Sequence, residues 1–183
     1  VEQAIGSVDI WVSALCAGII GPVAEELFFR KAMIDRLSKY HPIDAILFSA
    51  VLFALIHGNL TQFLYAFPLG VLLGIIYYRT QNIGYTILLH IAINMIGGVV
   101  PQLVMGGIAT LPESMNTLVT FVYSQIIIGI CVVGLIFLIR RRREFLPIQS
   151  SVPRFRRPFY LNAGFIIACV LFTGLFILSE VSL

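Results

Sequence analysis

The sequence predicts an all-α, polytopic integral membrane helix bundle, and two observations support this fold class. Of the 183 residues, 59% are hydrophobic and only 11% are charged, whereas a soluble domain carries about a quarter charged residues. The apolar residues also form continuous runs of a length suited to crossing a bilayer as helices. We therefore expect a single membrane-embedded domain over residues 1–183.

Six apolar segments are expected to form about six transmembrane helices. In chain order they are 8–29, 43–58, 62–78, 83–100, 116–139 and 159–179. The second and third are short for a hydrocarbon core about 30 Å thick, so we expect them to tilt or to end inside the bundle. The chain begins with Val1 rather than Met, and we expect it to lack an N-terminal part.

The basic residues predict the orientation of the chain. All 12 Lys and Arg residues lie in alternate connectors, and the intervening connectors, including 101–115, hold none. Because basic loops stay in the cytoplasm, we expect a multi-pass protein of the cell membrane with its basic loops cytoplasmic. The most basic connector, 140–158, is expected to be a cytoplasmic loop near anionic lipid. The net charge of +3 therefore gives no indication of nucleic-acid binding.

A few polar side chains interrupt the apolar segments. The first segment contains Glu25 and Glu26, with Arg30 at its end, and the second ends with His57. The fourth contains His90 and Asn94, which lie four residues apart and therefore on one helix face. Buried charges cost several kcal/mol unless they find partners. Polar groups on three helices therefore predict one converging site.

Each of these residues also has a plainer interpretation. Glu26 and Arg30 stand four residues apart and could form a structural ion pair. A lone intramembrane histidine, or Asn94, could simply hydrogen-bond one helix to another. With Arg30 assigned to Glu26, however, Glu25 has no local partner. The two histidines then become its candidates.

The expected depths of these residues conflict. If the first helix ends at Arg30, Glu25 lies near the inner membrane face. At about 1.5 Å per residue, His57 should instead lie about 20 Å from the inner face, where the second helix enters. By the same rise, His90 should lie about 10 Å past Ile83. Either the first helix extends further than its hydropathy predicts, or the second helix is strongly tilted.

Three short stretches carry a resemblance to a known family. EELFFR, FALIH and HIAIN match the patterns EExxxR, FxxxH and HxxxN in order. This set resembles the CAAX prenyl endopeptidase and bacteriocin-processing family, also called CPBP or Abi, over residues 15–100. The family core has about eight helices, which fits a chain that lacks its N-terminal part. The resemblance implies peptide-bond hydrolysis at a membrane-embedded glutamate site.

The resemblance also implies a role for each motif residue. Glu25 would activate water with the help of His57, whereas His90 and Asn94 would hold the oxyanion. The supporting residues would be Glu26, Arg30 and Phe53. These residue types suit amide hydrolysis, which needs a base for water and donors for the oxyanion. No serine or cysteine is matched to a base, so a covalent nucleophile is not indicated.

The resulting expectation is a CPBP-family intramembrane endopeptidase that uses no cofactor. Its partners would be a membrane-associated peptide or protein substrate, the lipid bilayer and a membrane-protein partner, with no nucleic acid. One alternative is a non-catalytic member of the same family: a membrane scaffold, a bacteriocin-immunity factor or a transporter accessory subunit. Another is a zinc hydrolase that uses a glutamate and two histidines as ligands, although the sequence has no HExxH. Short loops and a basic inner side favour a prokaryotic source.

Overall fold

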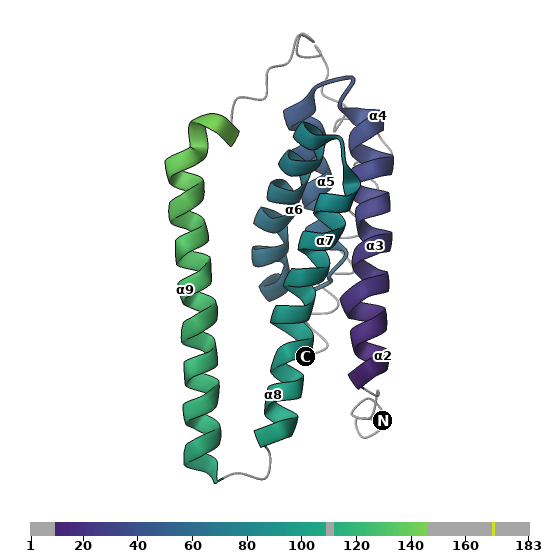
Figure 1. The fold of residues 1–183 in the computed structure, drawn as a ribbon. Coiled ribbons are helices and arrows are strands. Elements are labelled where there is room, and N and C mark those ends of the chain that lie inside the picture. The colour runs from purple at the N-terminus through teal and green to yellow at the C-terminus, as the bar shows by residue number, and fades with distance from the viewer. Residues whose placement is uncertain (1–9, 109–111, 146–169, 171–183) are drawn as a thin grey trace. The chain divides into compact units, whose positions relative to one another are not determined.

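A computed structural model of the protein describes residues 10–108, 112–145 and 170. In these ranges the chain forms helices joined by turns, without strands, which confirms the predicted fold class (Figure 1). Four helices are long and apolar enough to cross a membrane: Ile10–Leu37, Leu60–Thr80, Ile83–Val104 and Glu113–Arg141. A shorter apolar helix spans Pro42–Leu55. The protein is therefore a multi-pass helical membrane protein.

The chain divides into two compact units. One contains Val1–Pro22 and Ile91–Pro147, and the other contains Val23–His90 and Ile148–Leu183. The expectation of a single domain stays a prediction. The second unit holds most of the polar residues that the sequence singled out.

The first helix is longer than the sequence predicted. It comprises α2 (Ile10–Leu15), α3 (Gly21–Glu26) and α4 (Asp35–Leu37), with π-helical segments between them. These segments are η1 (Cys16–Ile20) and η2 (Leu27–Ile34). We expected the helix to end at residue 29, before its first basic residues. Instead it continues to Leu37, as the uninterrupted coil in Figure 1 shows.

Local pairing explains why the charged residues do not end this helix. Lys31 and Asp35 form an ion pair of 2.9 Å across one turn. The buried Tyr77 hydroxyl donates to the other Asp35 oxygen at 2.7 Å. Ion pairing between side chains four residues apart thus supports the helix beyond its first charges, with Lys31 itself 58% exposed. The longer helix relieves the conflict of depths, since Glu25 lies about 18 Å before Leu37 instead of at the helix end.

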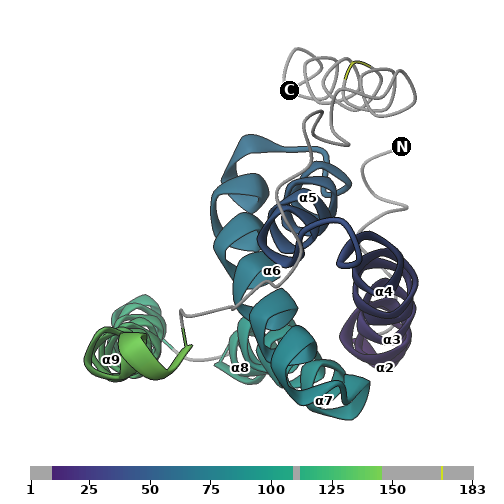
Figure 2. The same ribbon diagram turned by 90° about the horizontal axis from the view of Figure 1, so that it is seen from above.

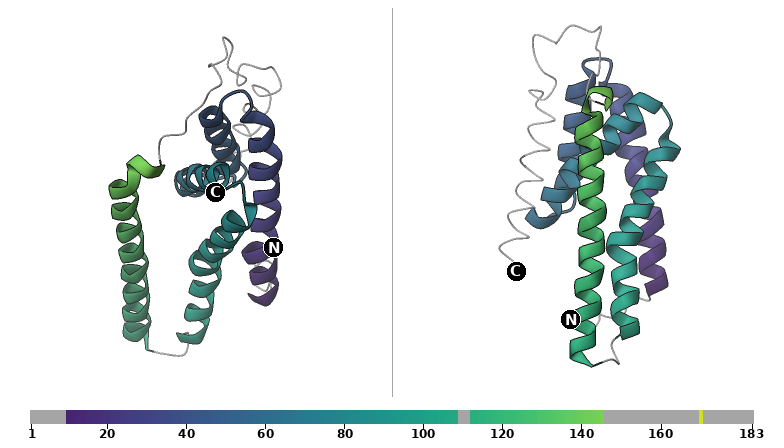
Figure 3. Two further views of the ribbon diagram at one scale, coloured as in Figure 1. Left: turned by 45° about the horizontal axis from the view of Figure 1, so that its top comes forward. Right: turned by 60° about the vertical axis from the view of Figure 1, so that its left-hand side comes forward.

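Two other helices also extend beyond their apolar segments. α7 (Ile83–Asn94) continues through η3 (Met95–Val99) into α8 (Val100–Ile108), as both views in Figure 3 show. Much of the expected 101–115 connector is therefore helical. α9 (Glu113–Phe145) likewise includes the first part of the 140–158 segment that we expected to be a loop. Residues 146–158 and most of the sixth apolar segment lie outside the described residues.

The second unit is built on a close pair of helices. α5 (Pro42–Leu55) and α6 (Leu60–Thr80) lie side by side (Figure 2) and are joined by a turn in which Gly58 has φ +73°. The Asn59 side chain caps α6 by accepting from the backbone N–H of Gln62 at 2.8 Å. A Cβ on Gly70 would lie 3.0 Å from the Cα of Ala50. A residue without a side chain at position 70 therefore permits the close packing of α5 and α6.

The hydrophobic core of this unit joins three helices. Phe29 from the first helix packs with α5 and α6 residues in a buried cluster of Phe29, Phe53, Ala54 and Ala66. A second cluster, nearer α4, consists of Ile34, Ile46 and Tyr77. Both clusters fix η2 against α5 and α6, and η2 begins directly after the two glutamates.

In the first unit, η1 and η3 pack against each other. A Cβ on Gly18 would come within 2.8 Å of the Met95 sulfur. The side-chain amide of Asn94 donates to the Ala17 carbonyl at 3.0 Å. From α9, the hydroxyl of Tyr123 donates to the carbonyl of Ile96. Side chains therefore hydrogen-bond both π-helical segments of this unit to other helices.

Candidate active site

The two adjacent glutamates occupy different environments at the end of α3. The side chain of Glu26 is fully buried, whereas that of Glu25 is 28% exposed. Glu26 places Oε2 at 3.1 Å from Nε of Arg30, which confirms the predicted pair. The surface of Glu25 is therefore partly open, whereas Glu26 is enclosed by the protein.

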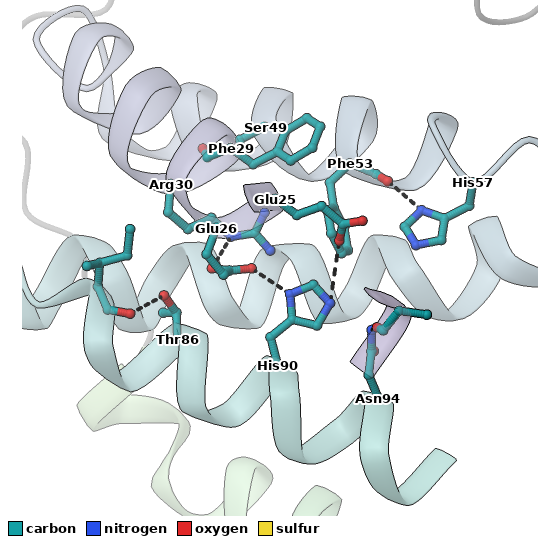
Figure 4. A network of polar contacts seen from close by, with 12 residues as sticks. Glu25, Glu26, Phe29, Arg30, Ser49, Phe53, His57, Thr86, His90 and Asn94 are labelled. Carbon is teal, nitrogen blue, oxygen red and sulfur yellow. Dashed lines mark hydrogen bonds and ion pairs between the residues drawn. The ribbon is translucent and has the colours of Figure 1, made fainter. Parts of the chain in front are cut away.

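His90 lies between the two carboxylates. Its Nδ1 is 2.9 Å from Oε1 of Glu26, and its Nε2 is 3.6 Å from Oε2 of Glu25 (Figure 4). The spacing of residues in the sequence predicted only the pair of Glu26 with Arg30, and the contact of Glu26 with His90 was not predicted. A carboxylate has two oxygens that can each accept a hydrogen bond. The ion pair with Arg30 uses one oxygen of Glu26, so the other is available to His90. The contact between Glu25 and a histidine agrees with the expectation.

His57 stands in the turn that follows α5. Its Nδ1 is 2.7 Å from the backbone carbonyl oxygen of Phe53. A carbonyl only accepts, so this contact assigns the ring proton to Nδ1 and leaves Nε2 of a neutral imidazole as an acceptor. The structure records an ion pair of Glu25 with His90 and none with His57. Within the described residues, His57 therefore offers Nε2 as an acceptor in the same unit.

Phe53 contacts several members of the site. Its ring centroid is 5.1 Å from that of His57 and 5.5 Å from that of His90, both edge-on. The guanidinium carbon of Arg30 lies over the ring face, 4.6 Å from the centroid. Such a cation–π contact partly offsets the loss of water around a buried cation. Phe53 thus separates and orients the polar side chains.

Arg30 is fully buried. Its Nε, Nη1 and Nη2 atoms make no hydrogen bond with the part of the chain that the structure describes, so the contact of Nε with Glu26 is an ion pair by distance alone. Among the described residues, the guanidinium of Arg30 therefore has an ion pair with Glu26 and a cation–π contact with Phe53. A buried cation of this kind depends strongly on its carboxylate.

Asn94 lies one turn beyond His90 on α7 but belongs to the first unit. Its amide nitrogen is engaged with the carbonyl of Ala17 at 3.0 Å. An amide group has two N–H donors, so one remains for another acceptor. The structure thus gives Asn94 a helix–helix contact, which was its plainer interpretation.

Ser49 is a site residue that the sequence analysis missed. It is buried on α5, and its hydroxyl donates to the backbone carbonyl of Phe29 at 2.8 Å. The only sequence signal is a serine one turn before Phe53 in an apolar helix. Figure 4 shows Ser49 and Phe29 together beside the glutamates and Arg30.

The described residues contain no group of three or more His, Cys, Asp or Glu side chains arranged to hold a metal ion. The two glutamates and His90 form one polar group in the second unit. Its contacts are those of hydrogen-bonded and ion-paired groups, with His90 Nδ1 at 2.9 Å from Glu26. The chemistry that this arrangement offers directly is proton transfer.

Comparison with known protein families gives a match over part of the chain. Residues 7–96 match the family described as type II CAAX prenyl endopeptidase Rce1-like. This segment resembles that family. The Rce1-like segment includes both glutamates and both histidines of the candidate site, as well as Asn94.

Three bacterial proteins are similar to part of this chain. The UPF0177 protein YbdJ of Lactococcus lactis is 34% identical over 95 residues, which cover 51% of this chain and 41% of YbdJ. The "putative membrane peptidase YdiL" of Bacillus subtilis is 32% identical over 81 residues, covering 44% of this chain and 33% of YdiL. The UPF0177 protein YxdF of L. lactis is 30% identical over 95 residues, covering 51% of this chain and 52% of YxdF.

The chain therefore spans between a third and about half of the length of these relatives. No solved structure matches it.

Proposed function

We propose that the protein is an intramembrane glutamate endopeptidase that hydrolyses peptide bonds in membrane-associated peptides or proteins. One observation carries the proposal: two adjacent carboxylates flank His90, and one of them is partly exposed while the other is buried. The Rce1-like family and the printed name of YdiL support a peptidase. The test is cleavage of a membrane-peptide library by the purified chain, measured as new peptide termini by mass spectrometry.

Glu25 is the proposed general base. Its exposed carboxylate takes a proton from water as the water oxygen bonds to the substrate's carbonyl carbon. The carbonyl electrons move to the oxygen, which becomes the oxyanion. When the C–N bond breaks, Glu25 returns the proton to the leaving nitrogen. The acceptor Nε2 of His57 can hold the same water in place.

The donors for the oxyanion are proposed to be an N–H at Nε2 of His90, since its Nδ1–H faces Glu26, and the second N–H of Asn94. Preorganised donors of this kind stabilise the charge that develops in the transition state. Glu26 supports His90 through the 2.9 Å contact with Nδ1, while Arg30 holds the other Glu26 oxygen. Phe53 packs against both histidine rings.

The proposal includes an orientation in the cell membrane, with the basic connectors in the cytoplasm. We expect a cysteine at Arg142 to be labelled by a membrane-impermeant thiol reagent only from the cytoplasmic side. A cysteine at Glu113, at the other end of α9, should be labelled only from outside. Labelling would use intact cells and inverted vesicles with Cys16, Cys131 and Cys169 replaced. External labelling at Arg142 would overturn the orientation.

The reaction is proposed to need no metal. A zinc ion bound by Glu25, His57 and His90 would leave Glu26 as the remaining base, and Glu26 is fully buried with both oxygens in ion pairs. We therefore expect extensive chelation to leave cleavage unchanged, and zinc analysis to find far less than one ion per chain. Cleavage that is lost on chelation and restored by stoichiometric zinc would instead make these residues ligands.

A further inference from the structure

The hydroxyl of Ser49 is used differently from other helical hydroxyls. Serine and threonine inside helices commonly donate to a carbonyl three or four residues earlier in their own helix. Five described side chains do so: Thr80, Thr86, Thr117, Thr120 and Ser124. Ser49 instead donates to Phe29 on a different helix, at 2.8 Å and with both residues buried.

The acceptor of this hydrogen bond lies in a π-helical segment. Phe29 belongs to η2, which starts at the residue after Glu26. π-Helical turns are rare, and they occur often at functional sites. A π turn holds more residues than an α turn. If η2 became an α-helix and lost the extra residue from its turn, the glutamates before η2 would rotate by about 100° relative to the residues after it. The conformation of η2 therefore decides where the two carboxylates point.

The same kind of contact recurs at the other π-helical segments of the described chain. In η1 the carbonyl of Ala17 accepts from Asn94, and in η3 the carbonyl of Ile96 accepts from Tyr123. In each case the donor is a side chain on another helix. A side-chain donor at a π-helical carbonyl is thus a repeated feature of this chain, and Ser49 supplies it beside the glutamates.

We propose that Ser49 is a positioning residue for the Glu25–Glu26 pair, acting through the carbonyl of Phe29. It does not touch the reacting atoms. Its hydrogen bond holds η2 in the π-helical form that lets both carboxylates meet His90. The inference deepens the proposed function and, for its effect on turnover, rests on it.

The test compares Ser49→Ala with Ser49→Thr, which keeps the hydroxyl, and with Ser124→Ala as the control. The hydroxyl of Ser124 donates within its own helix. We expect Ser49→Ala to lower kcat by about 10–100-fold, as misplaced catalytic groups do, with KM little changed. Ser49→Thr should restore most of kcat, and Ser124→Ala should leave it unchanged. A thermal unfolding curve in detergent establishes that each variant is folded.

A second readout requires no substrate. The chain has three histidines, and their ring nitrogens can be followed by NMR after ¹⁵N-histidine labelling. We expect the His90 signals to shift in Ser49→Ala, to return in Ser49→Thr and to stay in place in Ser124→Ala. Folded Ser49→Ala with unchanged His90 signals and unchanged kcat would overturn the positioning role. A further outcome is that the wild type cleaves no peptide while the His90 signals still shift in Ser49→Ala and return in Ser49→Thr. In that case the peptidase proposal fails and the positioning role stands.

Discussion

Replacement of Glu25 by glutamine is expected to abolish measurable turnover while leaving the protein folded. A glutamine amide has almost the same shape but cannot take a proton from water, and loss of a general base costs about 10²–10⁴-fold. Folding should survive because Glu25 is partly exposed and its recorded ion pair with His90 is long, at 3.6 Å. The measurement is kcat on a cleaved membrane peptide, together with thermal unfolding in detergent.

Glu113→Gln is the matched control for this experiment. Glu113 is an exposed glutamate in the first turn of α9. Its replacement removes one negative charge without touching the site, so turnover should stay at the wild-type level. Near wild-type turnover in a folded Glu25→Gln variant would show that another group activates water.

Replacement of Glu26 by glutamine is expected to destabilise the protein strongly. The change leaves Arg30 buried without its carboxylate, and loss of one partner of a buried ion pair costs about 3–5 kcal/mol of unfolding free energy. It also weakens the contact with His90 at 2.9 Å, so turnover should fall as well. The measurement is denaturant unfolding in detergent, compared with Glu25→Gln.

A double variant separates the ion pair from other effects of the Glu26 substitution. Replacing a whole buried ion pair by uncharged residues is often close to neutral. Adding Arg30→Met to Glu26→Gln should therefore recover much of the lost stability without restoring turnover. If Glu26→Gln unfolds like the wild type, the buried pair is not a structural element.

The sequence predicted the fold class because apolar runs directly reflect the bilayer. It also predicted the Glu26–Arg30 pair, since residues four apart in a helix are neighbours. It did not predict that the first helix continues to Leu37. Hydropathy places a boundary at the first charges, whereas the contacts of Asp35 with Lys31 and Tyr77 support the helix beyond that point.

Other features of the candidate site depend on contacts that no single helix encodes. The π-helical form of η2 is a local change in register, and packing against α5 accompanies it. The contact between Glu26 and His90 joins residues 64 positions apart. The role of Ser49 was equally hidden, because a lone serine in an apolar helix usually bonds to its own backbone. Spacing within a helix was predictable, while spacing between helices required the fold.

The most direct test of the central claim is peptide cleavage in ¹⁸O-labelled water. The purified chain, reconstituted in lipid nanodiscs, would be incubated with a library of membrane-associated peptides, and the products analysed by mass spectrometry. We predict new carboxyl termini that carry ¹⁸O with the wild type, and none with Glu25→Gln. Folded wild type that cleaves no peptide, or a Glu25→Gln variant that cleaves at the same rate, would contradict the account.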